Sequence, residues 1–395
     1  MVNKSVGVSG YLLFVLGGLM AIAPMSTDMY LPGFPSITKE LGLGLGQVEL
    51  TFSSYFLGML VGILFHGAFS DSFGRRASLV LGLVIYVLSS LWITMVDSLD
   101  HFVVARFLQG AGGSAGVVVV LAIVRDRCDA IEAAKVMSLI ALIMGAAPIL
   151  APSVGGLILK IGSWRSIFAV LTVFGLFLLL AVVLIVDGPD ATWEARRFWT
   201  TFKRYGAVFK DGKFLKYTLC QSLVVSSMFS YIAVSPFVLI ELHSISEDMF
   251  GLVFGFNAFG LIAASQLNRF LLRRYSPRDV LVKAMWLPFA GGVLLLINGV
   301  QAESIAYLVF PGFFIIVSSV GLVGPNATAL ALESQGESAG IASAIFKSAG
   351  FGAGMLSSLI LAASHDGTAF PVGVLAAIYG AFGFLFTRWV VAPAR

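Results

Sequence analysis

Three charged side chains lie inside long apolar stretches of the sequence. They are Asp28, Arg106 and Lys347. Of the 21 acidic residues, Asp28 is the only one that falls well inside such a stretch. A charge within an apolar membrane segment is costly and marks a functional candidate. Withdrawal from water favours the protonated form of a carboxyl group, whereas a nearby arginine favours its ionised form. We therefore expect Asp28 to carry a proton and Arg106 to modulate it. The structural alternative is a buried Asp28–Arg106 ion pair, or a helix-end acid solvated near the outer surface.

Lys347 falls about nine residues into its apolar stretch, at a depth of ~13 Å for a rise of ~1.5 Å per residue. We expect it to face a cavity, where it favours anionic or zwitterionic substrates or compensates Asp28. The alternative is a lysine that snorkels along a tilted helix. Aromatic, methionine and amide side chains suit the recognition of varied apolar compounds, although each alone is compatible with ordinary packing. The residues predicted to line the cavity with Lys347 are Tyr30, Tyr55, Gln109, Gln221, Met228, Phe229, Asn257, Gln266 and Met355.

The sequence lacks the residue groups that catalysis requires. The apolar stretches hold no paired carboxylates and no nucleophile next to a base, and no Gly-x4-Gly-Lys-Ser/Thr loop for ATP occurs. The four histidines are far apart, and the two cysteines suggest neither a disulfide framework nor a metal site. We therefore expect no enzyme activity, no metal and no cofactor.

The elements that carry these residues are predicted to be membrane-spanning helices. Hydrophobic residues make up 58% of the 395 residues and charged residues 12%, and no soluble domain has that composition. A bilayer core of ~30 Å needs ~20 helical residues. Twelve such stretches are predicted, which makes the chain an all-α polytopic membrane protein: 11–33, 48–69, 77–96, 101–124, 134–159, 164–186, 215–240, 249–271, 279–300, 304–325, 339–363 and 369–391.

The distribution of lysine and arginine predicts how the chain crosses the membrane. Twenty of the 25 lysines and arginines, from Lys4 to Arg395, fall on one side of the twelve stretches. Lys39, Lys160 and Arg165 fall on the other side. Positive residues concentrate in cytoplasmic loops, so both termini are expected in the cytoplasm. Because the basic residues are spread over short loops, they do not indicate a nucleic-acid partner.

Two halves of six helices, 1–187 and 214–395, are expected on either side of a polar segment at 188–213. Aromatic residues recur there at helical spacing with basic residues between them. This pattern predicts a short helix in the inner membrane interface. A plain tether is the alternative. The residues concerned are Phe198, Trp199, Phe202, Lys203, Arg204, Tyr205, Phe209 and Lys210.

Four motifs in the first half make the resemblance to a known family specific. The loop after the second stretch contains Gly67, Asp71, Gly74, Arg75 and Arg76 at the spacing Gly-x3-Asp-x2-Gly-Arg-Arg. Gly67 allows close helix approach, Asp71 suits a helix N-terminus, and Gly74 permits a tight turn. Arg75 is placed to pair with Asp126. The loop resembles motif A of the major facilitator superfamily; the alternative is a charged loop that only fixes topology.

The other three motifs point to drug:proton antiporters within that superfamily. The end of the first stretch, Pro24 to Pro35, resembles the helix-1 signature of the bicyclomycin-resistance (Bcr/CflA) branch. Arg106 to Gly110 resembles motif B, whose arginine is linked to proton transfer. A further run resembles the antiporter motif C, although Ala151 replaces a usual glycine. Its residues are Gly145, Pro148, Pro152, Gly155 and Gly156.

The resemblance implies a major facilitator fold and a proton-driven exporter of drugs or other small organic compounds. It also implies that the motif A cluster latches the halves while the protein faces outward, and that the protein works as a monomer in the bacterial inner membrane. A proton-coupled importer of a metabolite on the same fold is the alternative function. The expected partners are a small-molecule substrate, protons and the lipid bilayer.

Overall fold

The structure is a computed structural model and describes residues 10–186, 195–299 and 306–391. Lys4, Arg395 and positions 187–194 of the region between the halves lie outside the described residues. Within the described residues the chain is helical throughout, and twelve helices are long and apolar enough to cross a membrane. The prediction of an all-α chain with twelve spans is therefore confirmed.

Six spans precede the connecting helix α8 (Ala195–Val208). The first consists of α1 together with the short helices η1 and α2, and each of the others is a single helix. Their elements are α1 (Gly10–Asp28), η1 (Leu31–Gly33), α2 (Phe34–Glu40), α3 (Gln47–Phe73), α4 (Arg75–Ile93), α5 (Leu99–Arg127), α6 (Ala130–Ile161) and α7 (Trp164–Ile185).

Six further spans follow α8. Three spans combine consecutive elements: α9 with η2, α11 with α12, and α15 with the start of η4. The elements are α9 (Gly212–Pro236), η2 (Phe237–Leu242), α10 (Glu247–Leu271), α11 (Pro277–Ala284), α12 (Leu287–Gly299), α13 (Ala306–Leu332), η3 (Gly336–Ser338), α14 (Ala339–Ser364), α15 (Phe370–Phe386) and η4 (Thr387–Val391). The predicted end of the tenth span at residue 325 is too early, because α13 continues through Pro325 to Leu332.

Polar side chains fix several helix ends. Asp129 accepts hydrogen bonds from the backbone N–H groups of Ile131 and Glu132 at the start of α6. Asp211 does the same at the start of α9. Such caps satisfy N–H groups that have no partner within the helix. Between α3 and α4, Gly74 adopts φ +96°, a conformation that side chains disfavour, so the predicted tight turn is present.

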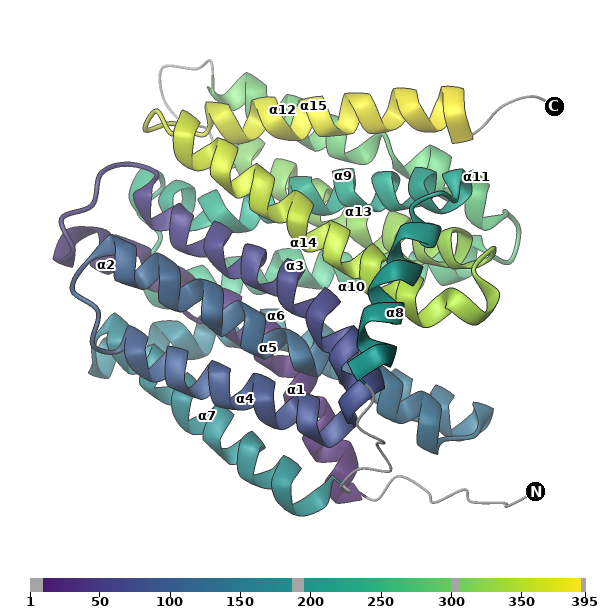
Figure 1. Cartoon of the computed structure of the whole chain (residues 1–395). Helices are drawn as coiled ribbons and strands as arrows, with labels where there is room; N and C mark the ends of the chain where they lie inside the picture. The colour runs from purple at the N-terminus through teal and green to yellow at the C-terminus, as the bar shows by residue number, and fades with distance from the viewer. Residues whose placement is uncertain (1–9, 187–194, 300–305, 392–395) are drawn as a thin grey trace, which may run out of the picture.

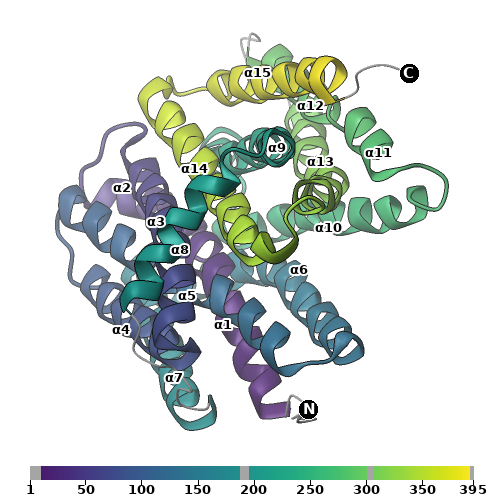
Figure 2. The same cartoon turned by 45° about the vertical axis from the view of Figure 1, so that its right-hand side comes forward.

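The two groups of helices lie side by side, with α3 and α6 of the first facing α14 and α10 of the second (Figures 1 and 2). α8 contacts both α3 and α14 at one end of the bundle. The ring of Phe198 lies 6.0 Å from that of Phe65, and the Tyr205 hydroxyl donates to the Leu64 carbonyl over 2.9 Å. The predicted helix at 198–209 is therefore present. Its place in a membrane interface stays a prediction.

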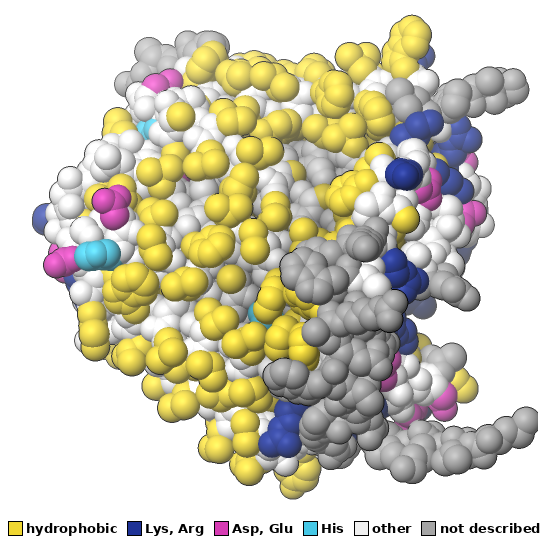
Figure 3. Space-filling model, viewed as in Figure 1, with side chains coloured by type: hydrophobic (Ala, Val, Ile, Leu, Met, Phe, Trp, Pro, Cys, Tyr) yellow, Lys and Arg dark blue, Asp and Glu magenta, His cyan; other side chains and the backbone are white. Residues whose placement is uncertain are grey.

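Charged side chains gather at one end of the bundle. Figure 3 shows apolar side chains over the middle of the visible face and Lys and Arg side chains concentrated at the right-hand edge. We call the end that carries α8 and the turn between α3 and α4 the basic side, and the opposite end, where α2 lies, the far side. The start of α1 and the end of α15 both lie on the basic side (Figure 1).

Candidate functional site

Asp28 lies in an apolar cavity between the two halves. It is the last residue of α1 and is only 4% exposed. The cavity has a volume of about 210 Å³ and is lined from the first half by α1, α3 and α6 and from the second by α9, α10, α13 and α14. Pro24, Phe56, Phe229 and Phe351 are among its walls. A carboxyl group therefore faces a space that both halves share and that is otherwise almost entirely apolar.

Arg106 lies fully buried in α5, within the first half. Its Nη1 donates to the carbonyl oxygen of Ser26 over 3.1 Å and to Gln109 Oε1. Its guanidinium carbon lies 4.3 Å from the ring centre of Tyr30 and 4.4 Å from that of Tyr55. Arg106 thus holds the last turn of α1, two residues before Asp28, instead of forming the ion pair with Asp28 that the alternative interpretation requires.

The residues predicted to line a substrate cavity fall into separate groups. Met228 and Phe229 line the central cavity around Asp28. Asn257 lies just behind its wall and donates to the hydroxyl of Tyr231, which does line it, over 3.0 Å. Tyr30, Tyr55 and Gln109 instead surround Arg106. Gln109 also donates to Ser90 Oγ over 2.8 Å, so its amide ties α5 to α4.

Three further predicted lining residues also do not reach this cavity. Gln266 is exposed on α10, so its assignment to the cavity is wrong. It follows Asn257 by nine residues, which is about two and a half helical turns, and therefore points to the opposite face. Gln221 and Met355 are partly buried in α9 and α14, but neither is among the lining residues of the central cavity. The Oε1 atom of Gln221 is buried without a hydrogen-bond partner in the described structure.

The residues that resemble motif C place α6 at the boundary between the halves. Gly145 and Pro148 line the central cavity. A Cβ on Gly155 would overlap the carbonyl oxygen of Met29, so this glycine lets α6 approach the segment that follows Asp28. Across the boundary, α6 packs against α10 of the second half. Pro152 lies inside the continuous helix, in the same half of α6 as Gly155 and Gly156.

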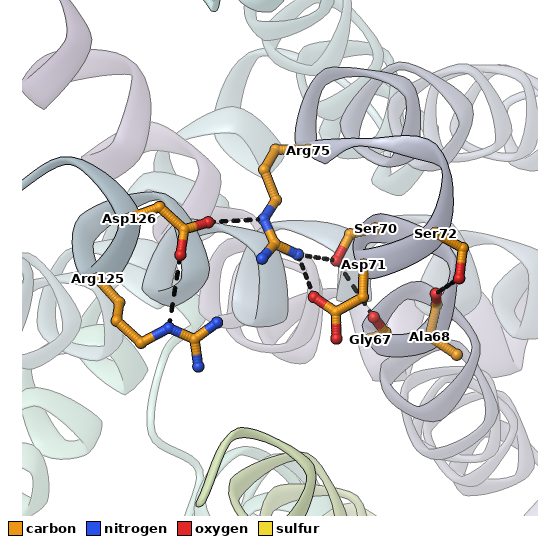
Figure 4. A network of polar contacts seen from close by, with 8 residues as sticks. All are labelled: Gly67, Ala68, Ser70, Asp71, Ser72, Arg75, Arg125 and Asp126. Carbon is orange, nitrogen blue, oxygen red and sulfur yellow. Dashed lines mark hydrogen bonds and ion pairs between the residues drawn. The ribbon is translucent and has the colours of Figure 1, made fainter. Parts of the chain in front are cut away.

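The residues that resemble motif A form a chain of charges on the basic side (Figure 4). Asp71 Oδ1 lies 2.5 Å from Arg75 Nη1, and Arg75 Nε lies 3.0 Å from Asp126 Oδ2. Arg125 Nε follows at 3.5 Å from Asp126 Oδ1. Arg76 points away and donates to the carbonyl of Val183 in α7. The pairing of Arg75 with Asp126 expected from the sequence is present, whereas the role of this cluster as a latch stays a prediction.

A second cavity opens between this cluster and the start of α14. Its volume is about 270 Å³, and its walls include Gly67 and Asp71 on one side and Gly340 and Lys347 on the other. Among the residues that the structure describes, Lys347 Nζ makes one hydrogen bond, to the carbonyl of Val117 at 3.4 Å. The halves are therefore separated here by a cavity whose wall carries a lysine with a single weak partner.

Tyr205 of α8 also lines this cavity, a position that no sequence pattern indicates. Its hydroxyl lies 3.2 Å from the place that a Cβ on Gly67 would take. Burial, and secondarily the charge of Asp71, raise the pKa of Tyr205 to about 12. The hydroxyl therefore stays protonated and keeps its hydrogen bond to Leu64.

Glu49 is the other side chain that the sequence reasoning missed. It lies three residues into α3 and is 3% exposed, so Asp28 is not the only buried acid among the described residues. Its position at the edge of an apolar stretch concealed this burial. Its neighbour is His365, from the loop between α14 and α15.

Comparisons with known sequences identify a family. Residues 16–358 match the model of the Major Facilitator Superfamily. The chain is 33% identical to the MFS-type transporter YdgK of Bacillus subtilis over 95% of this chain and 94% of that protein. It is 30% identical to the bicyclomycin resistance protein homolog of Haemophilus influenzae over 91% of both. A multidrug resistance protein MdtL of Klebsiella pneumoniae is 32% identical over 70% of both chains.

Solved structures share the fold. The xylose transporter XylE from E. coli, in a partially occluded inward open conformation, superposes with a TM-score of 0.72 over 97% of both chains. A D-xylose-proton symporter gives a TM-score of 0.71 over 97% of both. Each is 17% identical to this chain, so the likeness concerns the fold alone.

Proposed function

The chain belongs to the Major Facilitator Superfamily, a class of membrane transporters and not of enzymes, and from this we propose that it exports drugs or other small organic compounds in exchange for protons. Two of its relatives carry the names bicyclomycin resistance protein homolog and multidrug resistance protein. The observation that carries the proposal is the single carboxyl group of Asp28 in an apolar cavity between the halves.

Asp28 gives drug and proton a common place to compete. The walls of the cavity are aromatic, aliphatic and methionine side chains, which suit apolar compounds of varied shape. If a compound occupies the cavity only while Asp28 is deprotonated, binding of one ligand weakens binding of the other, and this reciprocal coupling is what exchange requires. Alternating exposure of the cavity to the two sides then moves drug and proton in opposite directions.

The direction of transport can be measured in inside-out membrane vesicles that contain the protein. We expect vesicles with an acidic interior to accumulate bicyclomycin or another compound to which the protein confers resistance. Accumulation should stop when an uncoupler removes the proton gradient. Loss of a preloaded compound under the same gradient would instead support import. Vesicles from cells without the protein are the control.

We further propose that the protein resides in the bacterial inner membrane with both termini in the cytoplasm, and that it works as a monomer. The basic side, which bears α8 and the Arg75–Asp126 cluster, is then the cytoplasmic side. The far side faces outward. In this orientation the cavity with Lys347 lies at the cytoplasmic entrance.

Asp71→Asn should reduce export at least about fivefold while the protein stays folded. The side chain of Asp71 is 36% exposed, and exposed ion pairs contribute under about 1 kcal/mol to stability. The variant interrupts the series of ion pairs from Asp71 through Arg75 to Asp126 and so weakens the latch. Export of a dye from cells with equal amounts of each protein measures the effect.

Asp97→Asn is the matched control for Asp71→Asn. Asp97 also faces a partner four residues away, His101, but it lies in the loop between α4 and α5 and is largely exposed. We expect export by this variant to be unchanged. Normal export by Asp71→Asn would leave Asp71 as an ordinary loop acid.

Lys347→Met should lower export of anionic and zwitterionic compounds at least about fivefold and leave cationic compounds less affected. The reason is that the ammonium group lies on a cavity wall with one weak hydrogen bond, so it is available to a ligand's negative group. Lys347→Arg, which keeps the charge, is the matched control and should preserve the preference. If the methionine variant exports every compound as the wild type does, Lys347 has no role in selecting substrates.

A further inference from the structure

On the far side, the two halves meet closely at the start of α3. Gly46, the residue before this helix, has φ +79°, and a Cβ on it would overlap the carbonyl oxygen of Ala362 near the end of α14. Glu49 stands one turn further along α3. It lies 22 residues before Asp71, and at ~1.5 Å per residue the two acids are ~33 Å apart along the helix. The halves are thus in contact around Glu49 and separated by a cavity near Asp71.

Glu49 faces a histidine from the other half. Its Oε1 lies 3.7 Å from Nε2 of His365, and the side chains of both residues are less than a tenth exposed. The His365 ring packs edge-on against Phe237, with ring centres 4.5 Å apart. The Gly367 N–H donates to Nδ1 over 3.3 Å, so the ring proton of the neutral form is on Nε2 and points toward Glu49. Burial lowers the pKa of His365, which favours this neutral ring.

In this arrangement Glu49 lacks the partners that an ionised carboxylate needs. Its Oε2 atom is buried without a hydrogen-bond partner among the described residues, and the 3.7 Å to His365 is too long for a hydrogen bond. Burying an unpaired charge costs far more free energy than burying a protonated carboxyl group. The adjoining cavity of about 10 Å³ holds at most one water molecule. The only ligand that this site has room for, besides water, is a proton.

The other titratable groups around Glu49 add no positive charge. Glu241, from the end of the seventh span, faces it and is itself exposed. Asp366 follows His365 in the loop, and Tyr30 approaches from the segment after α1. Glu241 thus adds a negative charge near a carboxyl group whose only basic neighbour among the described residues is a neutral histidine, and a negative neighbour also favours the protonated form.

We propose that Glu49 is a second proton-binding carboxyl of the transport cycle, which takes up a proton from the far side as the two halves close there. His365 is its positioning residue. The inference rests on the proposed function, since closing on the far side matters only to a transporter. While the far side is open, Glu49 is separated from α14 and ionises in water. Bringing Glu49 into contact with His365 requires that its carboxyl group be protonated. Proton uptake therefore favours the state in which the far side is closed.

The distance between spin labels across the far side tests this inference. Labels are placed at Met95 and Tyr307, which are exposed at the far ends of the two halves, after Cys128 and Cys220 have been replaced. In the full-length protein in lipid nanodiscs, we expect the short-distance population to grow as the pH falls. Glu49→Gln, which mimics the protonated acid, should raise the ratio of closed to open protein at alkaline pH at least about tenfold.

Two further variants keep the test decisive. Glu241→Gln makes the same chemical change at the exposed neighbouring acid and should keep the transition, with a midpoint only slightly lowered because one negative neighbour is lost. His365→Gln keeps the Glu49 carboxyl group, so it should keep a transition whose midpoint is displaced by about one pH unit or more. The inference is overturned if the wild-type distances do not depend on pH, or if Glu49→Gln retains the wild-type midpoint.

The distance measurement needs no substrate, so it separates this inference from the proposed function. A protein that exports nothing but shows the Glu49-dependent transition contradicts the proposed function and supports the proton site. A protein that exports its substrate with a transition insensitive to Glu49→Gln contradicts the proton site alone.

Discussion

Asp28→Asn should abolish the release of protons that substrate binding causes, and should reduce export at least about tenfold. Asparagine has nearly the shape of aspartate but cannot ionise, so the substitution removes the exchangeable proton and keeps the cavity of about 210 Å³. In purified protein with a pH-sensitive dye, addition of substrate should release protons from the wild type and none from the variant. Binding of a neutral substrate should persist, because the apolar walls are intact.

The variant is expected to fold. Asp28 makes no ion pair among the described residues, so asparagine leaves no opposite charge buried without its partner. Asp100→Asn, at an exposed acid in the first turn of α5, is the matched control and should release as many protons as the wild type. If folded Asp28→Asn protein still releases the wild-type number of protons, Asp28 is not the carrier and Glu49 becomes the first candidate.

Most of the architecture could be predicted from the sequence because hydropathy acts over whole segments. Each of the twelve predicted spans overlaps one span of the structure. The exceptions are local. The tenth span was predicted to end at residue 325, whereas α13 continues to Leu332, and Asn326 Nδ2 donates both to the Leu322 carbonyl and to Asn268 Oδ1. Such side-chain hydrogen bonds stabilise a helix next to proline, and they are not visible in the order of residues.

The site was harder to predict, because its residues meet across the boundary between the halves. Residue type alone placed Gln266 in the cavity, although it faces outward, and hid the burial of Glu49 at the edge of a span. Burial of Glu49 depends on the packing of α3 against α14, which follows it by almost three hundred residues. The charge of Arg106 marked it as a candidate in the sequence, but its contact with the carbonyl of Ser26 involves the backbone, and residue types do not indicate such a contact.

Arg106→Lys should lower export at least about tenfold and shift its pH profile toward alkaline values, although the positive charge is kept. The planar guanidinium lies against two tyrosine rings and reaches Ser26 and Gln109 with one nitrogen, a geometry that an ammonium group cannot reproduce. Its Nε and Nη2 atoms are buried without partners among the described residues, which leaves donors for a carboxylate in another state of the cycle. A lysine at this position does not hold its positive charge near the last turn of α1. Loss of that nearby positive charge favours the protonated form of Asp28.

The shift in the pH profile distinguishes this positioning role from a purely structural one. Arg165→Lys is the matched control, since Arg165 also stacks on an aromatic ring, with its guanidinium carbon 4.3 Å from the ring centre of Trp164, and pairs with Glu40 on the far side. The Arg165→Lys variant should alter the stability of the protein slightly and leave the pH profile of export unchanged. If Arg106→Lys exports more slowly with an unchanged profile, Arg106 only supports the packing of α1 against α5, and the proton affinity of Asp28 depends on the cavity alone.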